Sequence, residues 1–206
     1  MTTVYVSCTP TAVDADGICA SQSPAAGAIL INGALAASGV ATFGAAQLVR
    51  LTSAGNDSGI TFTFNGTDAD GGVQSQTVAG TNASNTDTTL YFKTITSITA
   101  SGSVTGAIVV GNLITSISPT LKINTNVNPV NFNLLAQLVS GTATFYMDYT
   151  FDPVGPYPSV WIADSVITNK TANMEGTWIK PISGLRLRLT ASSSGNVALK
   201  CIQAGV

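Results

Sequence analysis

The chain of 206 residues contains no histidine. This absence removes imidazole general bases, serine–histidine and cysteine–histidine nucleophile pairs, and histidine-based zinc sites. The three cysteines, Cys8, Cys19 and Cys201, lack the CxxC spacing that thiolate zinc sites prefer. Glycine-rich phosphate-binding motifs of the GxxxxGK[ST] or GxGxxG type are also missing. The sequence therefore predicts no catalytic residue and no cofactor, and we expect a protein that is not an enzyme.

Charged side chains are scarce, at 9% of the residues against a usual share of about 25%. The net charge is −2, and the eight basic residues are scattered. Only Arg186 and Arg188 stand close together, on one face of an expected strand, which is typical of a solvated or inter-subunit surface rather than of a phosphate-binding patch. We therefore expect no nucleic-acid partner. Because solubility normally depends on charge, we also expect partners to cover much of this surface.

The cysteines and the first residues bear on where the protein is made. An odd number of cysteines favours a reducing compartment, although Cys8 and Cys19 flank a turn-like segment and their pairing stays open. The opening residues MTTVYVSCTP lack the basic and apolar regions of a signal peptide. No run approaches the ~18 apolar residues of a membrane helix. We expect synthesis in a cytoplasm and no membrane partner.

What the chain does contain is threonine, 28 residues of it, in short alternating segments that favour β-strands. In residues 60–64, ITFTF, the apolar side chains fall on one face and the threonines on the other. Residues 184–192, GLRLRLTAS, alternate in the same way. Turns rich in glycine, asparagine and aspartate recur every 8–12 residues, without intervening helical patterns. These features predict an all-β fold of antiparallel β-sandwich or jelly-roll-like modules.

The sequence also suggests how the modules are arranged. Residues 1–27 are rich in proline, alanine, serine and glycine and predict a loose N-terminal arm. Two sandwich modules are expected over 28–115 and 116–206, and one jelly-roll domain over 28–206 is the alternative. A short helix competes with a strand only in residues 131–141, NFNLLAQLVSG.

One stretch raises the question of a metal ion. Asp68 and Asp70 in TDADGG have the spacing of a calcium-binding loop. An EF-hand loop ends with a bidentate glutamate at its twelfth position, however, where this chain has Ala79. A hairpin tip needs only aspartate and glycine between two alternating strands. We interpret the stretch as a turn and predict no metal, with calcium as the alternative.

Two further groups of side chains are weighed as sites. A glycosidase needs a pair of carboxylates, and the candidates here are Asp148, Asp152 and Glu175. Their positions in turns and on strands favour structural roles. Aromatic residues in or beside a proline-rich loop can stack on sugars. The residues concerned are Tyr157, Trp161 and Trp178.

Residues 51–111 contain the segments SAGNDSGITFT, GTDADG and FKTITSITASGSVTG, and the C-terminal part contains GTATFYMDYTFDP and GLRLRLTASSSGNVALKCIQAG. With these segments, the chain resembles a β-module of structural proteins from tailed bacteriophages. Together they cover roughly residues 28–206. These are structural motifs, so they indicate a kind of module more than a role.

The resemblance implies a virion protein, a capsid decoration (cement) protein on the outside of the major capsid lattice. Such proteins bind the major capsid protein, often as homotrimers, and hold neighbouring capsomers together. Contacts are expected from the arm, with Thr2 and Thr3, and from the 153–161 loop, with Tyr157 and Trp161. The alternative is a tail-fibre or adhesin module that binds a host surface glycan.

Overall fold

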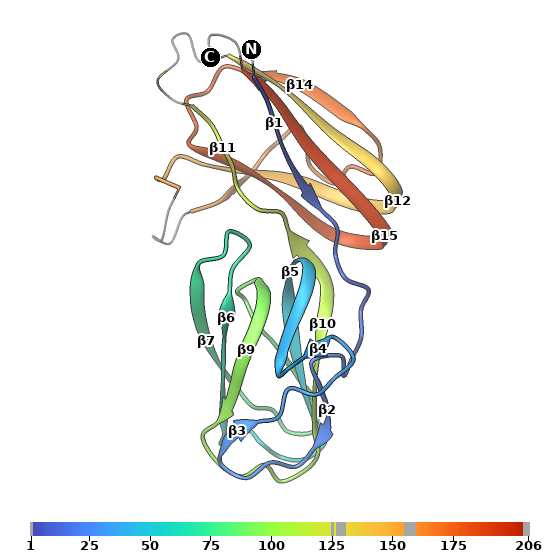
Figure 1. Cartoon of the computed structure of the whole chain (residues 1–206), viewed down its shortest axis with the longest axis vertical. Coiled ribbons are helices and arrows are strands. Elements are labelled where there is room, and N and C mark those ends of the chain that lie inside the picture. Colours follow the sequence, from blue (N-terminus) through green and yellow to red (C-terminus); the bar gives the residue numbers. More distant parts are fainter. Residues whose placement is uncertain (1, 125, 127–130, 155–159, 204–206) are drawn as a thin grey trace. The chain divides into compact units, whose positions relative to one another are not determined.

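The chain is all-β in the computed structural model, which describes residues 2–124, 126, 131–154 and 160–203 (Figure 1). These residues form fifteen strands and no helix, and every strand pairing between them is antiparallel. The arrangement is consistent with a β-sandwich, so the predicted fold class is confirmed. Within the described part of the chain, no helix has the length and apolar character needed to cross a membrane.

The strands belong to two compact units. The N-terminal unit comprises Thr11–Ile114, and the C-terminal unit comprises Thr115–Val206 together with Met1–Pro10. The boundary between the units lies between Ile114 and Thr115, one residue before the boundary between residues 115 and 116 that the sequence predicts. The first ten residues belong to the C-terminal unit, which the sequence did not suggest.

The N-terminal unit is built around strands in the order β10-β5-β9-β6-β7, with β2 on β10, β3 on β9, and β4 and β8 on β5. Their bounds are β2 Cys19–Gln22, β3 Gly27–Ile29, β4 Ala36–Ala37, β5 Val40–Ser53, β6 Thr61–Thr67, β7 Val73–Ala79, β8 Asn85–Asp87, β9 Phe92–Ala100 and β10 Ile108–Ile117. The last residues of β10 continue into the C-terminal unit.

Alternation determines which side chains fill the core of this unit. Ile60, Phe62 and Phe64 are buried, whereas the threonines between them are not. Phe43 of β5 and Phe92 of β9 belong to the same buried cluster. The expected period of two in this segment is confirmed; it places two aromatic rings in the interior of the unit, beside those of β5 and β9.

The C-terminal unit is organised by two long strands, β12 and β15, that pair along most of their length. Register shifts near Leu138, Thr142 and Thr144 interrupt the ladder, and such bulges let a strand bend. The bounds are β1 Thr2–Cys8, β11 Leu121–Lys122, β12 Phe132–Thr150, β13 Ile162–Ala163, β14 Met174–Trp178 and β15 Gly184–Gln203. Leu185, Leu187 and Leu189 are all fully buried, as their alternation predicts.

The predicted N-terminal arm is wrong for the first residues. Thr2–Cys8 form β1, which pairs with β15 from Thr2 opposite Gln203 to Cys8 opposite Val197 (Figure 1). Further on, Cys19–Gln22 form β2 and pair with β10. The partner of β1 lies at the other end of the chain, so local composition carried no sign of it.

The helix considered for residues 131–141 is replaced by a strand. β12 begins at Phe132, with Phe132, Leu134 and Ala136 buried and Asn133 and Leu135 on the opposite face. Pairing with β14 on one side and β15 on the other satisfies the backbone of this segment. Two flanking strands therefore decide an otherwise ambiguous apolar run.

Candidate functional site

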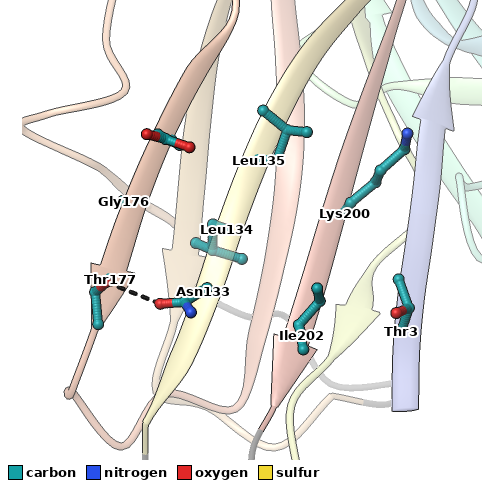
Figure 2. Close-up of a pocket in the computed structure, with 9 residues that line it drawn as sticks. Thr3, Asn133, Leu134, Leu135, Gly176, Thr177, Lys200 and Ile202 are labelled. Carbon is teal, nitrogen blue, oxygen red and sulfur yellow. Dashed lines mark hydrogen bonds between the residues drawn. The ribbon is translucent and has the colours of Figure 1, made fainter. Parts of the chain in front are cut away.

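Four neighbouring strands of the C-terminal unit, in the order β14-β12-β15-β1, present one continuous surface (Figure 2). We call it the four-strand face, and it is made of two rows of side chains. The first row is Thr177, Asn133, Ile202 and Thr3. The second row is Glu175, Leu135, Lys200 and Tyr5.

The rows enclose a shallow groove of about 530 Å³. Thr177 Oγ1 donates to Asn133 Oδ1 at 2.8 Å across one side of the groove (Figure 2). Lys200 Nζ donates to Gln137 Oε1 at 2.6 Å. Tyr5 is 67% exposed and Ile202 39% exposed. The surface is thus mostly uncharged, partly apolar and open to a partner.

Sequence reasoning predicted contacts on this face only from the N-terminal arm, with Thr3 named, and it weighed Glu175 only as a candidate acid. Thr3, predicted as a contact residue, is exposed and lines the groove. Thr2 lies in β1, but its side chain is outside the described part of the chain. Leu135, Glu175 and Lys200 were not predicted as contact residues. The signal that would have found Leu135 is the alternation in residues 132–138, which becomes clear once that segment is known to be a strand.

A second cluster on the C-terminal unit joins two arginines to one aspartate. Arg188 binds both carboxylate oxygens of Asp148, at 3.0 and 3.1 Å, and Arg186 contacts Oδ2 at 3.4 Å. The Asp148 side chain is only 4% exposed. The Arg186 guanidinium lies 4.2 Å from the centre of the Trp161 ring, and the Arg188 guanidinium 4.5 Å from that of Tyr146.

This cluster positions Trp161, the predicted loop aromatic. Burial of a carboxylate is tolerated because two guanidiniums compensate its charge, and the aromatic rings hold both guanidinium planes by cation–π contact. Arg186 and Arg188 point the same way from one strand, as expected, but they bind Asp148 instead of forming a simply solvated face. The arrangement fixes Trp161 with Arg186 against its ring.

The other residues weighed as sites are not brought together. Tyr157 lies outside the described residues. Trp178 is 8% exposed and packs edge-on against Tyr149, whereas Trp161 contacts Arg186. Asp148 is held by the arginines and Asp152 accepts the Val160 N–H at 2.6 Å. Glu175 stands on the four-strand face, so these acids have separate surroundings.

Residues 68–72 form the tip of the β6–β7 hairpin, as interpreted from the sequence. Asp68 Oδ1 accepts the N–H groups of Asp70 and Gly72, at 2.9 and 2.7 Å, and Gly71 takes a positive φ of 85°. The Asp68 carboxylate therefore closes the turn. Among the residues that the structure describes, no group of three or more histidine, cysteine, aspartate or glutamate side chains is arranged to hold a metal ion.

The cysteines are buried thiols, and within the described ranges they form no disulfide. Burial raises the pKa of the Cys19 thiol to about 12 and that of Cys201 to about 11. Both therefore stay protonated at neutral pH and are poor nucleophiles. Cys8 Sγ lies 3.6 Å from Ser116 Oγ. The pairing of Cys8 with Cys19, left open by the sequence, does not occur.

Comparison with known proteins adds little to this description. No protein-family model and no curated protein sequence matches the chain. An allantoicase structure is 7% identical, with a TM-score of 0.23, over 78% of this chain and 75% of that one. Allantoicase from Saccharomyces cerevisiae is 6% identical, with a TM-score of 0.24, over 78% and 76%. A structure of infectious bursal disease virus is 11% identical, with a TM-score of 0.21, over 99% and 71%. With TM-scores this low, none of these likenesses bears on fold or function.

Proposed function

We propose that this chain is a structural protein of a tailed-bacteriophage virion, a decoration protein that binds the outside of the capsid and stabilises the head. The resemblance of residues 51–111 and of the C-terminal part to phage structural modules is the starting point. The observation that carries the proposal concerns the polar side chains on the exposed strands. These side chains form hydrogen bonds with each other across neighbouring strands, and few of them are charged.

These cross-strand bonds recur in both units. In the N-terminal unit, Thr63 bonds Thr77 at 2.8 Å and Asn65 donates to Ser97 at 3.0 Å. In the C-terminal unit, Thr177 donates to Asn133 in the same way. Covering a charge costs far more free energy than covering a neutral group that already has a hydrogen bond. A surface built in this way loses little when a neighbouring protein covers it, which suits a protein whose work is to form many contacts in an assembly.

The glycan-binding alternative draws no comparable support from the geometry. The aromatic residues on which it depends have different surroundings, since Trp178 is almost fully buried and Arg186 lies against the ring of Trp161. Proteins that bind sugars by stacking need an open ring face. The proposal therefore places contacts of the virion on the neutral strand surfaces, with Thr3 and Trp161 among the contact residues.

Add-back to particles tests the proposed function. Phage grown without this gene are expected to yield heads that release DNA at a lower temperature, and the purified chain is expected to bind those heads and restore their stability. Cosedimentation with heads and with isolated tails measures where it binds. Failure to bind heads would overturn the proposal, and binding to tails or to a glycan array, lost on Trp161→Ala, would favour the adhesin role.

A further inference from the structure

We propose that the four-strand face binds the same face of a second copy of this chain, about a two-fold axis parallel to β12 and passing over Leu135. The charges of the second row carry this inference. In register, Lys200 on β15 and Glu175 on β14 lie one strand to either side of Leu135. The two charges of opposite sign are therefore symmetric about β12.

The symmetry of the charges selects the axis. A two-fold axis along β12 exchanges the two sides of the face, so Lys200 of each copy meets Glu175 of the other, and the pair forms twice. An axis across the strands would instead place lysine on lysine and glutamate on glutamate, which is repulsive. Sheets stacked about 10 Å apart allow side chains from both faces to meet midway. Leu135 then packs on its own copy at the axis.

The Glu175 carboxylate and the Lys200 ammonium group can each still bind an opposite charge of a second copy. Glu175 is exposed, and its side-chain carboxylate makes no hydrogen bond or ion pair with any residue that the structure describes. Lys200 uses one of three ammonium hydrogens on Gln137. The remaining members of both rows are uncharged, so no like charges oppose the contact. A face that is complementary to itself in this way is the mark of an isologous interface.

The size of the face limits the strength of the dimer. With the axis along β12, only β14, β12 and β15 of the two copies overlap, and three strands about 4.8 Å apart with six residues of about 3.4 Å give roughly 300 Å² of surface. Stable interfaces bury about 800 Å² on each partner. The dimer is therefore weak in solution, and its detection requires protein concentrations up to about the millimolar range.

Charge reversal tests the pairing. In sedimentation velocity, the chain is expected to dimerise, and Lys200→Glu and Glu175→Lys are each expected to weaken dimerisation at least tenfold, because each creates two like-charge contacts. An equimolar mixture of the two variants is expected to regain association, since all contacts in the heterodimer are then of opposite sign. Lys122→Glu and Asp16→Lys, exposed changes of the same sign outside the face, are the matched controls and should dimerise like the unaltered chain.

A crosslink keeps the test independent of the charge variants. Because the native cysteines are buried, Leu135→Cys introduces one accessible thiol at the axis. Sheets about 10 Å apart hold the two backbones too far apart for a disulfide, so a bis-maleimide that spans this distance is expected to give a crosslinked dimer. A chain that is monomeric at about 1 mM and does not crosslink overturns the inference, as does a variant mixture that fails to associate. The inference goes beyond the proposed function and does not rest on it: self-association is measured on the purified chain and capsid binding on particles, so either can fail alone.

Discussion

The buried carboxylate of Asp57 in the N-terminal unit offers the most detailed test of the structure. Asp57 is completely buried, and Oδ1 accepts the Thr105 N–H at 2.7 Å and the Thr105 hydroxyl at 3.0 Å. The Ser53 hydroxyl donates to Oδ2. Asp57 thus ties the end of β5 to the segment that precedes β10, and its substitution should weaken the unit.

Two substitutions separate the shape of this side chain from its charge. Asp57→Ala leaves three donors without an acceptor, at about 1–3 kcal/mol for each fully buried group. Because the Thr105 bonds are partly accessible to water, we expect a total loss near the lower end, about 3–5 kcal/mol of unfolding free energy. Asp57→Asn keeps an oxygen for Thr105 and lets the Ser53 hydroxyl act as acceptor, so only charge assistance is lost, about 1–2 kcal/mol.

The pH dependence gives the same network a second signature. Burial on its own raises the pKa of Asp57, but the hydrogen bonds from Ser53 and Thr105 outweigh it and the net pKa is lowered. A lowered pKa in the folded state contributes stability that is present above the unfolded value, about 3.9, and is lost as the pH falls through the folded value. The advantage of the native chain over Asp57→Asn should therefore be full at pH 7 and shrink below about pH 4.

Calorimetry of the full chain measures both effects. Both tryptophans lie in the C-terminal unit, so tryptophan fluorescence does not follow the unit that holds Asp57. Equal unfolding free energies for the native chain and Asp57→Ala at pH 7 would refute the network. A difference between the native chain and Asp57→Asn that stays constant from pH 7 to pH 3 would refute the lowered pKa.

Three other perturbations probe separate features. Gly66→Ala should lower the free energy of unfolding in urea by about 2 kcal/mol or more, because the new Cβ would meet a backbone oxygen of β9 at 1.9 Å. The control Gly59→Ala, whose Cβ would have nothing within 4 Å, should be near neutral. Equal stabilities of the two variants would contradict the close approach of β6 to β9 at this bulge. Calcium or EDTA should leave the melting temperature unchanged, because the Asp68 carboxylate closes a turn. A rise in melting temperature with calcium would instead show that the turn binds the ion. The thiols of Cys19 and Cys201 should react with a thiol reagent only when the chain unfolds, and rapid labelling of the native chain would show that they are accessible. The free energy of unfolding should fall as the pH rises above about 9, because the thiols ionise there in the unfolded chain and not in the folded one.

Features set by neighbouring residues could be predicted from the sequence. The β6–β7 hairpin follows from alternation on both sides of an aspartate–glycine turn, and the inward leucines of β15 follow from a period of two. Both depend on side chains only a few residues apart. Local pattern is sufficient in such cases because strand faces and turn conformations are set by local chemistry.

Features that depend on distant pairing could not be predicted in this way. β1 was expected to be loose because its stabilising partner, β15, lies at the opposite end of the chain. Asp148 meets Arg186 and Arg188 only because β12 and β15 pair in one particular register. The four-strand face has the same origin, since its rows draw residues from the first strand and from three strands near the other end of the chain. The sequence indicated the N-terminal arm, with Thr3, as a contact region, but not the strands that lie beside it.

The composition and architecture of the virion test the proposed function most directly. Electron cryomicroscopy of particles grown with and without this gene should show difference density on the outer surface of the capsid shell, of a size that fits the two β-units of this chain. The same particles should contain the chain in a fixed molar ratio to the major capsid protein. Identical head density in the two maps, or density confined to the tail, would contradict the decoration role.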